Sequence, residues 1–254
     1  MTVLQEDTVR QLHLKGGQTV FHVTERTYVT QEARDYIKDK KLTLAVDDAP
    51  AVNGDIRPAK EQLSGDYVTL GGTHLSEKPE HMTHLHGNVL VPKTHPRIAL
   101  RGKLDSLEGQ IIALQVVTER AGAGQLTAGL EELLQYCRGL LAAEVTEKPL
   151  PPMKLLGLDE AGLREHSHHP QAHYGIGHLL PSHQLGEIGA GLNLLRTASR
   201  EVELAAAEAF CLPDGTAQRG DLLQGLNRLS SACYLLMLQW AAKTLRRNEE
   251  SEHE

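Results

Sequence analysis

Apolar residues recur three, four or seven positions apart through most of the chain after residue 95, which is the pattern of amphipathic helices with one buried face. Glycine at 122 and prolines at 149, 151 and 152 interrupt this pattern, as residues that end helices do. The pattern predicts long helices over about 96–120, 126–141, 188–210 and 220–247, and a shorter one over 159–165. Four long helices and one short helix predict a five-helix bundle.

The first 60 residues have a different pattern. Residues 20–23 and 42–46 read as short strands, and Thr30 is placed to cap a helix over 31–40. The predicted fold class is therefore an all-α core with a small N-terminal α/β extension. We expect the chain to divide into four parts. The first is the extension over 1–60, which ends in a linker over 47–60, and the second is a His-containing loop region over 61–95. A helix-bundle domain over 96–247 and a frayed tail over 248–254 follow.

Composition and charge narrow the class of protein. The formal net charge of −7 argues against nucleic-acid binding, which needs a basic face. No apolar run approaches the roughly 20 residues of a membrane span, and the polar first residues predict no secretory signal. Cys137, Cys211 and Cys233 are too far apart for a zinc or disulfide pattern, so we expect buried thiols in a reducing, cytoplasmic compartment.

Two segments carry residue types that bind phosphate. Arg196, Arg200 and Glu203 stand at positions i, i+4 and i+7 of one predicted helix, so they share a stripe. Two guanidinium groups oriented by a carboxylate suit a polyanion, whereas a solvated ion-pair face is the alternative. Lys93 and Thr94 lie in a proline-stiffened loop before a helix and are further phosphate candidates, with a solvent-exposed lysine as the alternative.

Histidines are concentrated just before the predicted bundle. His74, His81, His84 and His86 are candidates for a divalent metal site, because neutral imidazole is a common ligand of transition metals. No cysteine pair accompanies them, and polar loop histidines are the alternative interpretation.

Four segments together resemble a known family. They are Leu104-Asp105-Ser106-Leu107, Leu180-Pro181, the run from Arg196 to Glu203, and Leu226-Asn227-Arg228-Leu229-Ser230-Ser231. In this combination the chain resembles the ATP:cob(I)alamin adenosyltransferases over about residues 93–247. Residues 78–85 and 101–105, with the N-terminal extension, resemble the ethanolamine-utilisation branch.

The resemblance implies an activity and roles for matching residues. It implies transfer of the 5′-deoxyadenosyl group of ATP to the cobalt of reduced cobalamin, with release of triphosphate. Arg196 and Arg200 resemble the triphosphate-binding arginines, and Asp105 resembles an aspartate that pairs with the first arginine across a subunit interface. The implied catalytic residues are these three, and the ATP-binding residues are Lys93, Thr94, Arg101, Arg196, Arg200, Glu203 and Asn227.

A further segment is implied to bind cobalamin. It contains Ile176, His178, Leu179 and Leu180, and the family phenylalanine that displaces the lower axial ligand falls at His178 or Leu179. We favour Leu179, because an imidazole could itself coordinate cobalt. The sequence departs from the family at Glu201 and Ser231, where the motifs have arginine and aspartate, and it lacks the clustered cysteines that some ethanolamine-type enzymes carry.

The resemblance also implies cofactors and partners. The substrates are ATP, which binds with Mg²⁺, and cobalamin as cob(II)alamin and cob(I)alamin. The protein is expected to form a homotrimer with sites between subunits and to lie in the cytoplasm, within a bacterial microcompartment or beside it. A flavin reductase or similar protein is expected to donate the electron, and a cobalamin-dependent ammonia-lyase to accept the product. Two alternatives come from other classes: a non-catalytic helical partner of an ethanolamine-utilisation complex, and a His-rich metal-dependent hydrolase. Neither explains why the motifs occur together in family order.

Overall fold

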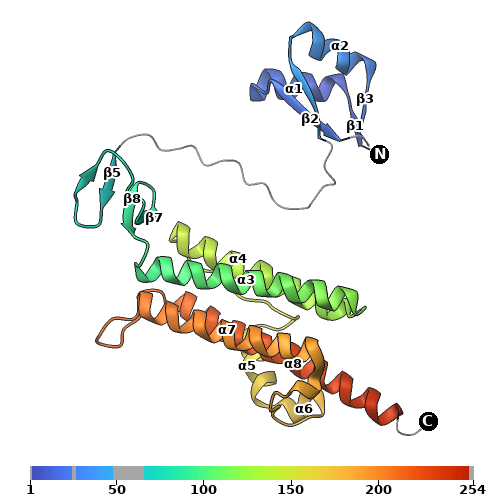
Figure 1. Ribbon diagram of the computed structural model, residues 1–254, viewed down its shortest axis with the longest axis vertical. Coiled ribbons are helices and arrows are strands. Elements are labelled where there is room, and N and C mark those ends of the chain that lie inside the picture. Colours follow the sequence, from blue (N-terminus) through green and yellow to red (C-terminus); the bar gives the residue numbers. More distant parts are fainter. Residues whose placement is uncertain (1, 25–26, 48–65, 252–254) are drawn as a thin grey trace. The chain divides into compact units, whose positions relative to one another are not determined.

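The computed structural model describes residues 2–24, 27–47 and 66–251 (Figure 1). The chain divides into two compact units, Met1–Gln62 and Leu63–Glu254. Each unit has its own cluster of buried apolar side chains. Within the described ranges, no helix combines the length and the apolar character needed to cross a membrane.

The first unit is a small α/β unit, as predicted. It contains β1 (Thr2–Leu4), α1 (Glu6–Gly16), β2 (Val20–Thr24), β3 (Thr27–Val29), α2 (Gln31–Asp39) and β4 (Thr43–Asp47). Strand β1 pairs in parallel with β3, and β2 with β4. Thr30 caps α2 through a hydrogen bond that its hydroxyl accepts from the Ala33 amide, which confirms the predicted cap. The predicted linker lies outside the described residues, apart from Asp47.

Helix α1 and strands β1 and β3 were not predicted. Gln5 at the start of α1 makes no side-chain cap, so the sequence lacks the usual signal of a helix start. Strands of three residues are too short to show an alternating pattern.

The second unit begins with a small sheet where the sequence predicted a loop region. Strands β5 (Tyr67–Thr69), β6 (His74–Leu75), β7 (Met82–His86) and β8 (Val89–Pro92) pair in the order β6-β5-β8-β7. The strands are short, and an irregularity between His84 and His86 interrupts the alternation of β7. Leu85, Leu90 and Val91 are buried, so the sheet buries apolar side chains that lie among many histidines in the sequence.

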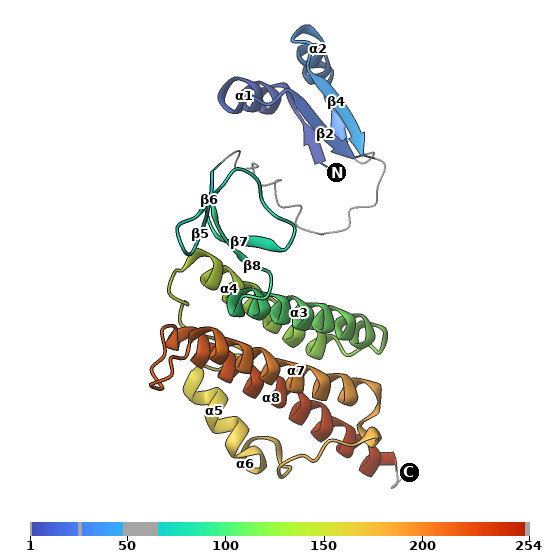
Figure 2. The ribbon, with the colours of Figure 1, turned by 60° about the vertical axis from the view of Figure 1, so that its left-hand side comes forward.

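The helical bundle follows the predicted pattern closely. Its long helices are α3 (Pro96–Arg120), α4 (Gly124–Thr146), α7 (Gly186–Phe210) and α8 (Gly220–Ser251), joined by the shorter α5 (Glu160–His168), α6 (Pro170–Tyr174) and η1 (His183–Leu185). Helix α3 packs between α4 and α7, while α5 and α6 pack on α8 (Figures 1 and 2). Helix α6 lies in a segment predicted to be a loop, and α8 continues to Ser251 where a frayed tail was expected.

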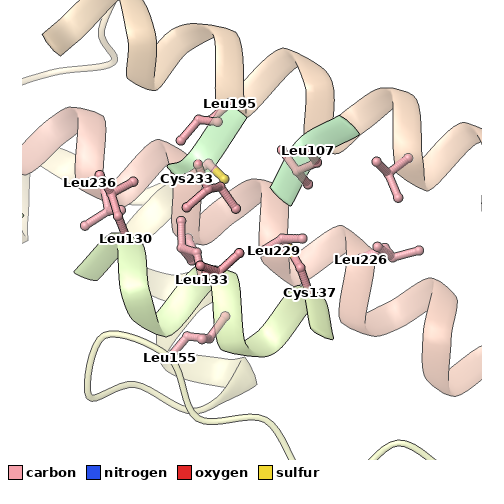
Figure 3. Packing of buried hydrophobic residues seen from close by; sticks show 14 of the residues in the cluster. Leu107, Leu130, Leu133, Cys137, Leu155, Leu195, Leu226, Leu229, Cys233 and Leu236 are labelled. Atoms are coloured by element: carbon pink, nitrogen blue, oxygen red, sulfur yellow. The ribbon is translucent and has the colours of Figure 1, made fainter. Parts of the chain in front are cut away.

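Leucine side chains form most of the bundle core. Leu107, Leu133, Leu195 and Leu229 project from four different helices toward one another (Figure 3). A Cβ atom at Gly191 would lie 2.6 Å from Leu114 Cδ1, so a larger residue at this position of α7 would require the Leu114 side chain on α3 to shift.

Two of the three cysteines are buried as predicted, but the third is not. Cys137 and Cys233 lie in the bundle core, whereas Cys211 is exposed. Cys211 ends α7 and precedes a turn around Gly215, so the amphipathic pattern of the helix no longer applies to it.

Candidate functional site

A cavity of about 320 Å³ brings the two predicted arginines together. Arg196 and Arg200 line it from α7, one helical turn apart. The residues that line it are Ser167, His168, His178, Arg196, Arg200, Ser230, Ser231 and Tyr234. Leu192, Leu195 and Val202 occupy the buried stripe of α7, so core packing fixes the rotation that places the arginines at the cavity.

The cavity carries positive charge that no acidic side chain balances. Arg196 Nε and Nη2 donate to Asn193 Oδ1 over 3.2 and 3.0 Å, which orients the guanidinium group and leaves it without an anionic partner. Within the described ranges, neither Arg196 nor Arg200 forms an ion pair with an aspartate or glutamate. Two guanidinium groups with the hydroxyl groups of Ser230 and Ser231 can bind a phosphate chain.

Glu203 and Asn227, predicted to lie at the nucleotide site, are in direct contact. Asn227 Nδ2 donates to Glu203 Oε1 over 2.7 Å, and Arg228 Nη2 donates to Asn227 Oδ1. The contact joins α7 to α8, and these two helices also bear the arginines and serines of the cavity. The structure therefore brings these predicted nucleotide residues to the same pair of helices.

His178, not Leu179, is the side chain at the cavity wall. The backbone N–H of Leu179 donates to Tyr234 Oη over 3.0 Å, and the Leu179 side chain packs against the bundle core, as does Ile176. Leu180 is 88% exposed. The Leu179 side chain is thus partly engaged in core packing, and its role as the displacing side chain stays a prediction.

Arg101, predicted to bind ATP, makes its hydrogen bonds within the fold. Its Nε donates to Glu144 Oε2 over 2.5 Å, and its Nη2 donates to the carbonyl oxygen of Leu85 over 2.7 Å. Glu144 is buried and also accepts from Arg97 Nε over 2.5 Å. Arg101 thus ties β7 and α3 to α4, and it does not line the cavity.

Asp105, Lys93 and Thr94 are exposed and lie away from the cavity of their own chain. Lys93 and Thr94 precede α3, whose first turn meets the end of α7, where Arg97 lies 5.8 Å from the Phe210 ring centre. Phe210 lies roughly 15 Å further along the α7 axis than Arg200. Within one chain, the structure therefore does not bring these three predicted residues to the cavity that the arginines line.

Glu201 stands where the family motif has an arginine, but this position does not line the cavity. Glu201 Oε2 accepts from Lys103 Nζ over 2.6 Å, on the side of α7 that faces α3. The position therefore forms an exposed ion pair between two helices, while Arg196 and Arg200 face α8.

The upstream histidines do not assemble into a metal site. Among the residues that the structure describes, no three His, Cys, Asp or Glu side chains gather closely enough to hold an ion. His74 lies on β6, His81 precedes β7, and His86 lies at the end of β7, all exposed. His84 is half-buried with its ring against Tyr67. His74 therefore lies on one edge strand of the sheet, whereas the other three lie on or beside β7 at the opposite edge.

A second cavity, of about 450 Å³, is lined by acidic residues and is a poor site for a polyanion. Asp159, Glu160 and Asp221 line it. Asp159 caps α5, Glu160 accepts from Gln224 Nε2 over 2.7 Å, and Asp221 binds Arg219. These carboxylates already have partners within the fold.

Sequence reasoning missed Tyr234 and His168 at the cavity and noted Ser231 only as a departure. Ser230, Ser231 and Tyr234 follow Asn227 by three, four and seven residues, so helical spacing places them on the face of α8 that bears Asn227. That spacing could have identified Tyr234. His168 comes from α5, and its position depends on how α5 packs on α8.

A comparison with family models and a comparison with individual proteins agree on the family that this chain resembles. A family model described as Cobalamin adenosyltransferase matches residues 74–240. The chain is 29% identical over 253 residues to Corrinoid adenosyltransferase EutT of Salmonella typhimurium, covering 94% of this chain and 92% of that protein. It is 35% identical over 164 residues to Corrinoid adenosyltransferase EutT of Escherichia coli K12, covering 65% of this chain and 60% of that protein. No solved structure matches the chain.

Proposed function

Because this chain belongs to the cobalamin adenosyltransferase family, we propose that it transfers the 5′-deoxyadenosyl group of ATP to the cobalt of reduced cobalamin, forming adenosylcobalamin and triphosphate. Relatives named as corrinoid adenosyltransferases support the reaction and place the chain in the ethanolamine-utilisation branch. The observation that carries the assignment to a site is the cavity in which Arg196 and Arg200 meet without an acidic partner among the described residues.

The reduced cobalt is the nucleophile in this reaction, so the protein supplies no serine, cysteine or general base. Cobalt forms a bond to the 5′ carbon of ATP, and the bond from that carbon to the triphosphate oxygen breaks. Negative charge grows on the leaving triphosphate. Arg196 and Arg200 stabilise that charge, and Mg²⁺ bound to the phosphates shares the task. The cavity hydroxyl groups of Ser230 and Ser231 are further donors to phosphate oxygens.

Glu203 and Asn227 hold the nucleoside end of ATP. Their mutual hydrogen bond fixes both side chains before the substrate binds. A preformed contact of this kind lowers the entropic cost of orienting the 5′ carbon toward cobalt.

A homotrimer with sites between subunits completes the constellation. Asp105 of a neighbouring copy pairs with Arg196, and Lys93 and Thr94 of that copy contact phosphate. Two observations support the assembly. Asp105 is exposed and has no ion-pair partner within the described part of its own chain. Exposed apolar side chains also lie on α3 and α7, namely Ile112, Val116, Leu194 and Leu204.

The reaction implies an electron donor and an acceptor for the product. We assign a flavin reductase or similar protein to the reduction of cob(II)alamin, and a cobalamin-dependent ammonia-lyase to the product, in the cytoplasm or at a microcompartment. The two alternative functions have less support: the named relatives are transferases, and the described histidines form no metal group for a hydrolase.

An anaerobic assay tests the proposed function. Purified protein is mixed with ATP, Mg²⁺ and chemically reduced cobalamin, while the visible spectrum and the phosphate products are followed. We expect adenosylcobalamin and intact triphosphate in equal amounts. A protein that binds corrinoid without forming this product, or that releases phosphate in its absence, contradicts the assignment.

A further inference from the structure

Arg228 lies beside the two residues assigned to the nucleoside, although no step of the reaction uses it. Its Nη2 donates a hydrogen bond to Asn227 Oδ1, and Asn227 Nδ2 donates to Glu203 Oε1 over 2.7 Å. We propose that Arg228 is a positioning residue that fixes the orientation of the Asn227 amide, so that Asn227 and Glu203 present one donor and one acceptor to the nucleoside of ATP. The inference rests on the proposed function, which assigns this pair to the nucleoside.

The chemistry of the three side chains allows one orientation of the Asn227 amide. A guanidinium group only donates hydrogen bonds, and an ionised carboxylate only accepts them. The amide oxygen must therefore face Arg228, and the amide nitrogen must face Glu203. The reversed orientation would place two donors against each other at Arg228 and two acceptors against each other at Glu203. Both hydrogen bonds would then be lost.

The contact with Arg228 adds a restraint that Glu203 alone does not give. The terminal torsion of an asparagine side chain has a broad, nearly two-fold preference, so one hydrogen bond leaves the amide room to turn, whereas contacts at both ends fix it. Arg228 is half-buried, and within the described ranges it forms no ion pair with a carboxylate. Its hydrogen bond to the amide oxygen is of the charge-assisted kind, which is stronger than a neutral one.

Two polar groups of the pair are left for a ligand. The amide nitrogen of Asn227 has a second N–H, and Glu203 has a second oxygen, Oε2, and the contact between the two side chains uses neither. Both side chains are half-buried, so they still reach solvent. A nucleoside offers matching groups, because a ribose hydroxyl group both donates and accepts, and adenine carries an amino donor near a ring-nitrogen acceptor.

The order of the side chains along α7 and α8 matches the order of the groups in ATP. Arg200 stands three residues before Glu203 on α7, and Ser231 stands four residues after Asn227 on α8. On both helices, about one turn of about 5.4 Å thus separates the cavity lining from the Glu203–Asn227 pair. A nucleoside attached to a phosphate chain in the cavity can reach this pair.

Arg228→Met tests the inference, because methionine keeps an apolar stem and removes the donors. Equilibrium titration of the full-length protein with Mg²⁺ measures the Kd for ATP and, separately, the Kd for inorganic triphosphate. We expect Arg228→Met to weaken ATP binding about tenfold and to leave triphosphate binding within about twofold. Arg228→Lys keeps a donor and should bind ATP within about threefold of the unaltered protein. Weaker binding of both ligands in Arg228→Met, or unchanged binding of ATP, overturns the proposal.

Two further variants separate the proposed role from a general effect on the fold. Arg138→Met is the matched control: Arg138 is a half-buried arginine on α4 whose Nε lies 3.6 Å from Glu108 Oε2, and it does not line the cavity, so both Kd values should stay unchanged. Arg228→Met/Asn227→Ala should bind ATP no more weakly than Asn227→Ala alone, because no amide is left to orient. An additional loss in the double variant contradicts the inference.

Two analogues identify the part of the nucleoside that the pair contacts. ITP has an oxygen in place of the amino group of adenine, and 2′,3′-dideoxy-ATP lacks both ribose hydroxyl groups. We expect the unaltered protein to bind one of them at least about tenfold more weakly than ATP, and Arg228→Met to lose most of that preference. No preference in the unaltered protein, or one that Arg228→Met keeps in full, refutes the inference. Failure of the unaltered protein to bind ATP or triphosphate at all counts against the proposed function instead.

Discussion

Asn227 donates a hydrogen bond of 2.7 Å to Glu203, and this contact joins α8 to α7, the two helices that also bear the serines and arginines of the cavity. Glu203 stands three residues after Arg200 on α7, close enough along the helix to neutralise it. The carboxylate instead accepts a hydrogen bond from the amide on α8, and among the described residues it forms no ion pair with Arg200. The arrangement gives a carboxylate suited to the nucleoside and, beside it, arginines suited to phosphate.

Removing the acceptor of this hydrogen bond should weaken nucleotide binding. We expect Glu203→Ala to raise the KM for ATP about tenfold, since about one hydrogen bond and its orienting effect are lost. Glu203→Gln keeps an acceptor oxygen, so its KM should stay within about threefold of the original. Steady-state rates at saturating reduced cobalamin give both values. Equal effects of the two substitutions would mean that the negative charge, and not the contact with Asn227, is what matters.

The two arginines should affect the rate of the chemical step. Arg196→Ala and Arg200→Ala are each expected to lower kcat about 100-fold, the typical cost of losing one group that stabilises transition-state charge. Neither side chain belongs to the buried core, so the melting temperature should hardly change. Arg120→Ala, at the exposed end of α3, is the matched control and should leave kcat unchanged. A rise in KM for ATP with normal kcat would show binding without catalytic stabilisation.

The bundle and the arginine helix were predictable because both depend on local sequence. The helical period fixes which side of α7 is buried, and Arg196 and Arg200 then share one stripe whatever packs against it. The predicted bounds of α3 agree with the structure for the same reason: Pro96 begins the helix, and the chain turns at Gly122.

The small sheet and the role of Arg101 depend on contacts between distant segments, which no local pattern reveals. The resemblance of residues 101–105 to the family implied a phosphate ligand at Arg101, whereas its partner Glu144 is 43 residues away and no local pattern connects the two. The position of His178 is a similar case. A loop sequence does not tell which of two adjacent side chains faces the core, and here a hydrogen bond to Tyr234 orients the backbone.

The pairing of Glu144 with Arg97 and Arg101 should be a large contribution to stability. The Glu144 side chain is 1% exposed, and removing it leaves two mostly buried guanidinium groups without an anion. We expect Glu144→Ala to lower the free energy of unfolding by about 3–5 kcal/mol. Urea unfolding followed by circular dichroism measures this.

Glu147 provides the control for that measurement, because it binds the same Arg97 from the surface. Its side chain is 52% exposed, and its Oε1 lies 2.8 Å from Arg97 Nη1. Glu147→Ala should cost less than about 1 kcal/mol. Comparable losses in the two variants would mean that burial of Glu144 adds nothing to the pair.

The contact between Asp221 and Arg219 should make stability depend on pH in the acid range. Hydrogen bonds from the Arg219 guanidinium group, opposed in part by burial and reinforced by the Leu150 N–H, lower the pKa of Asp221 from 3.8 to about 2. A carboxylate with a lowered pKa stabilises the folded state above pH 3.8, and this contribution is lost as the pH falls from 3.8 toward 2.

Asp221→Asn should therefore lower the free energy of unfolding by about 1–2 kcal/mol at neutral pH. The difference from the unaltered protein should shrink when unfolding in urea is measured at about pH 3. Glu119→Gln, on the exposed surface of α3, should show neither effect. A difference for Asp221→Asn that is the same at both pH values would mean that the loss comes from packing and not from the charge.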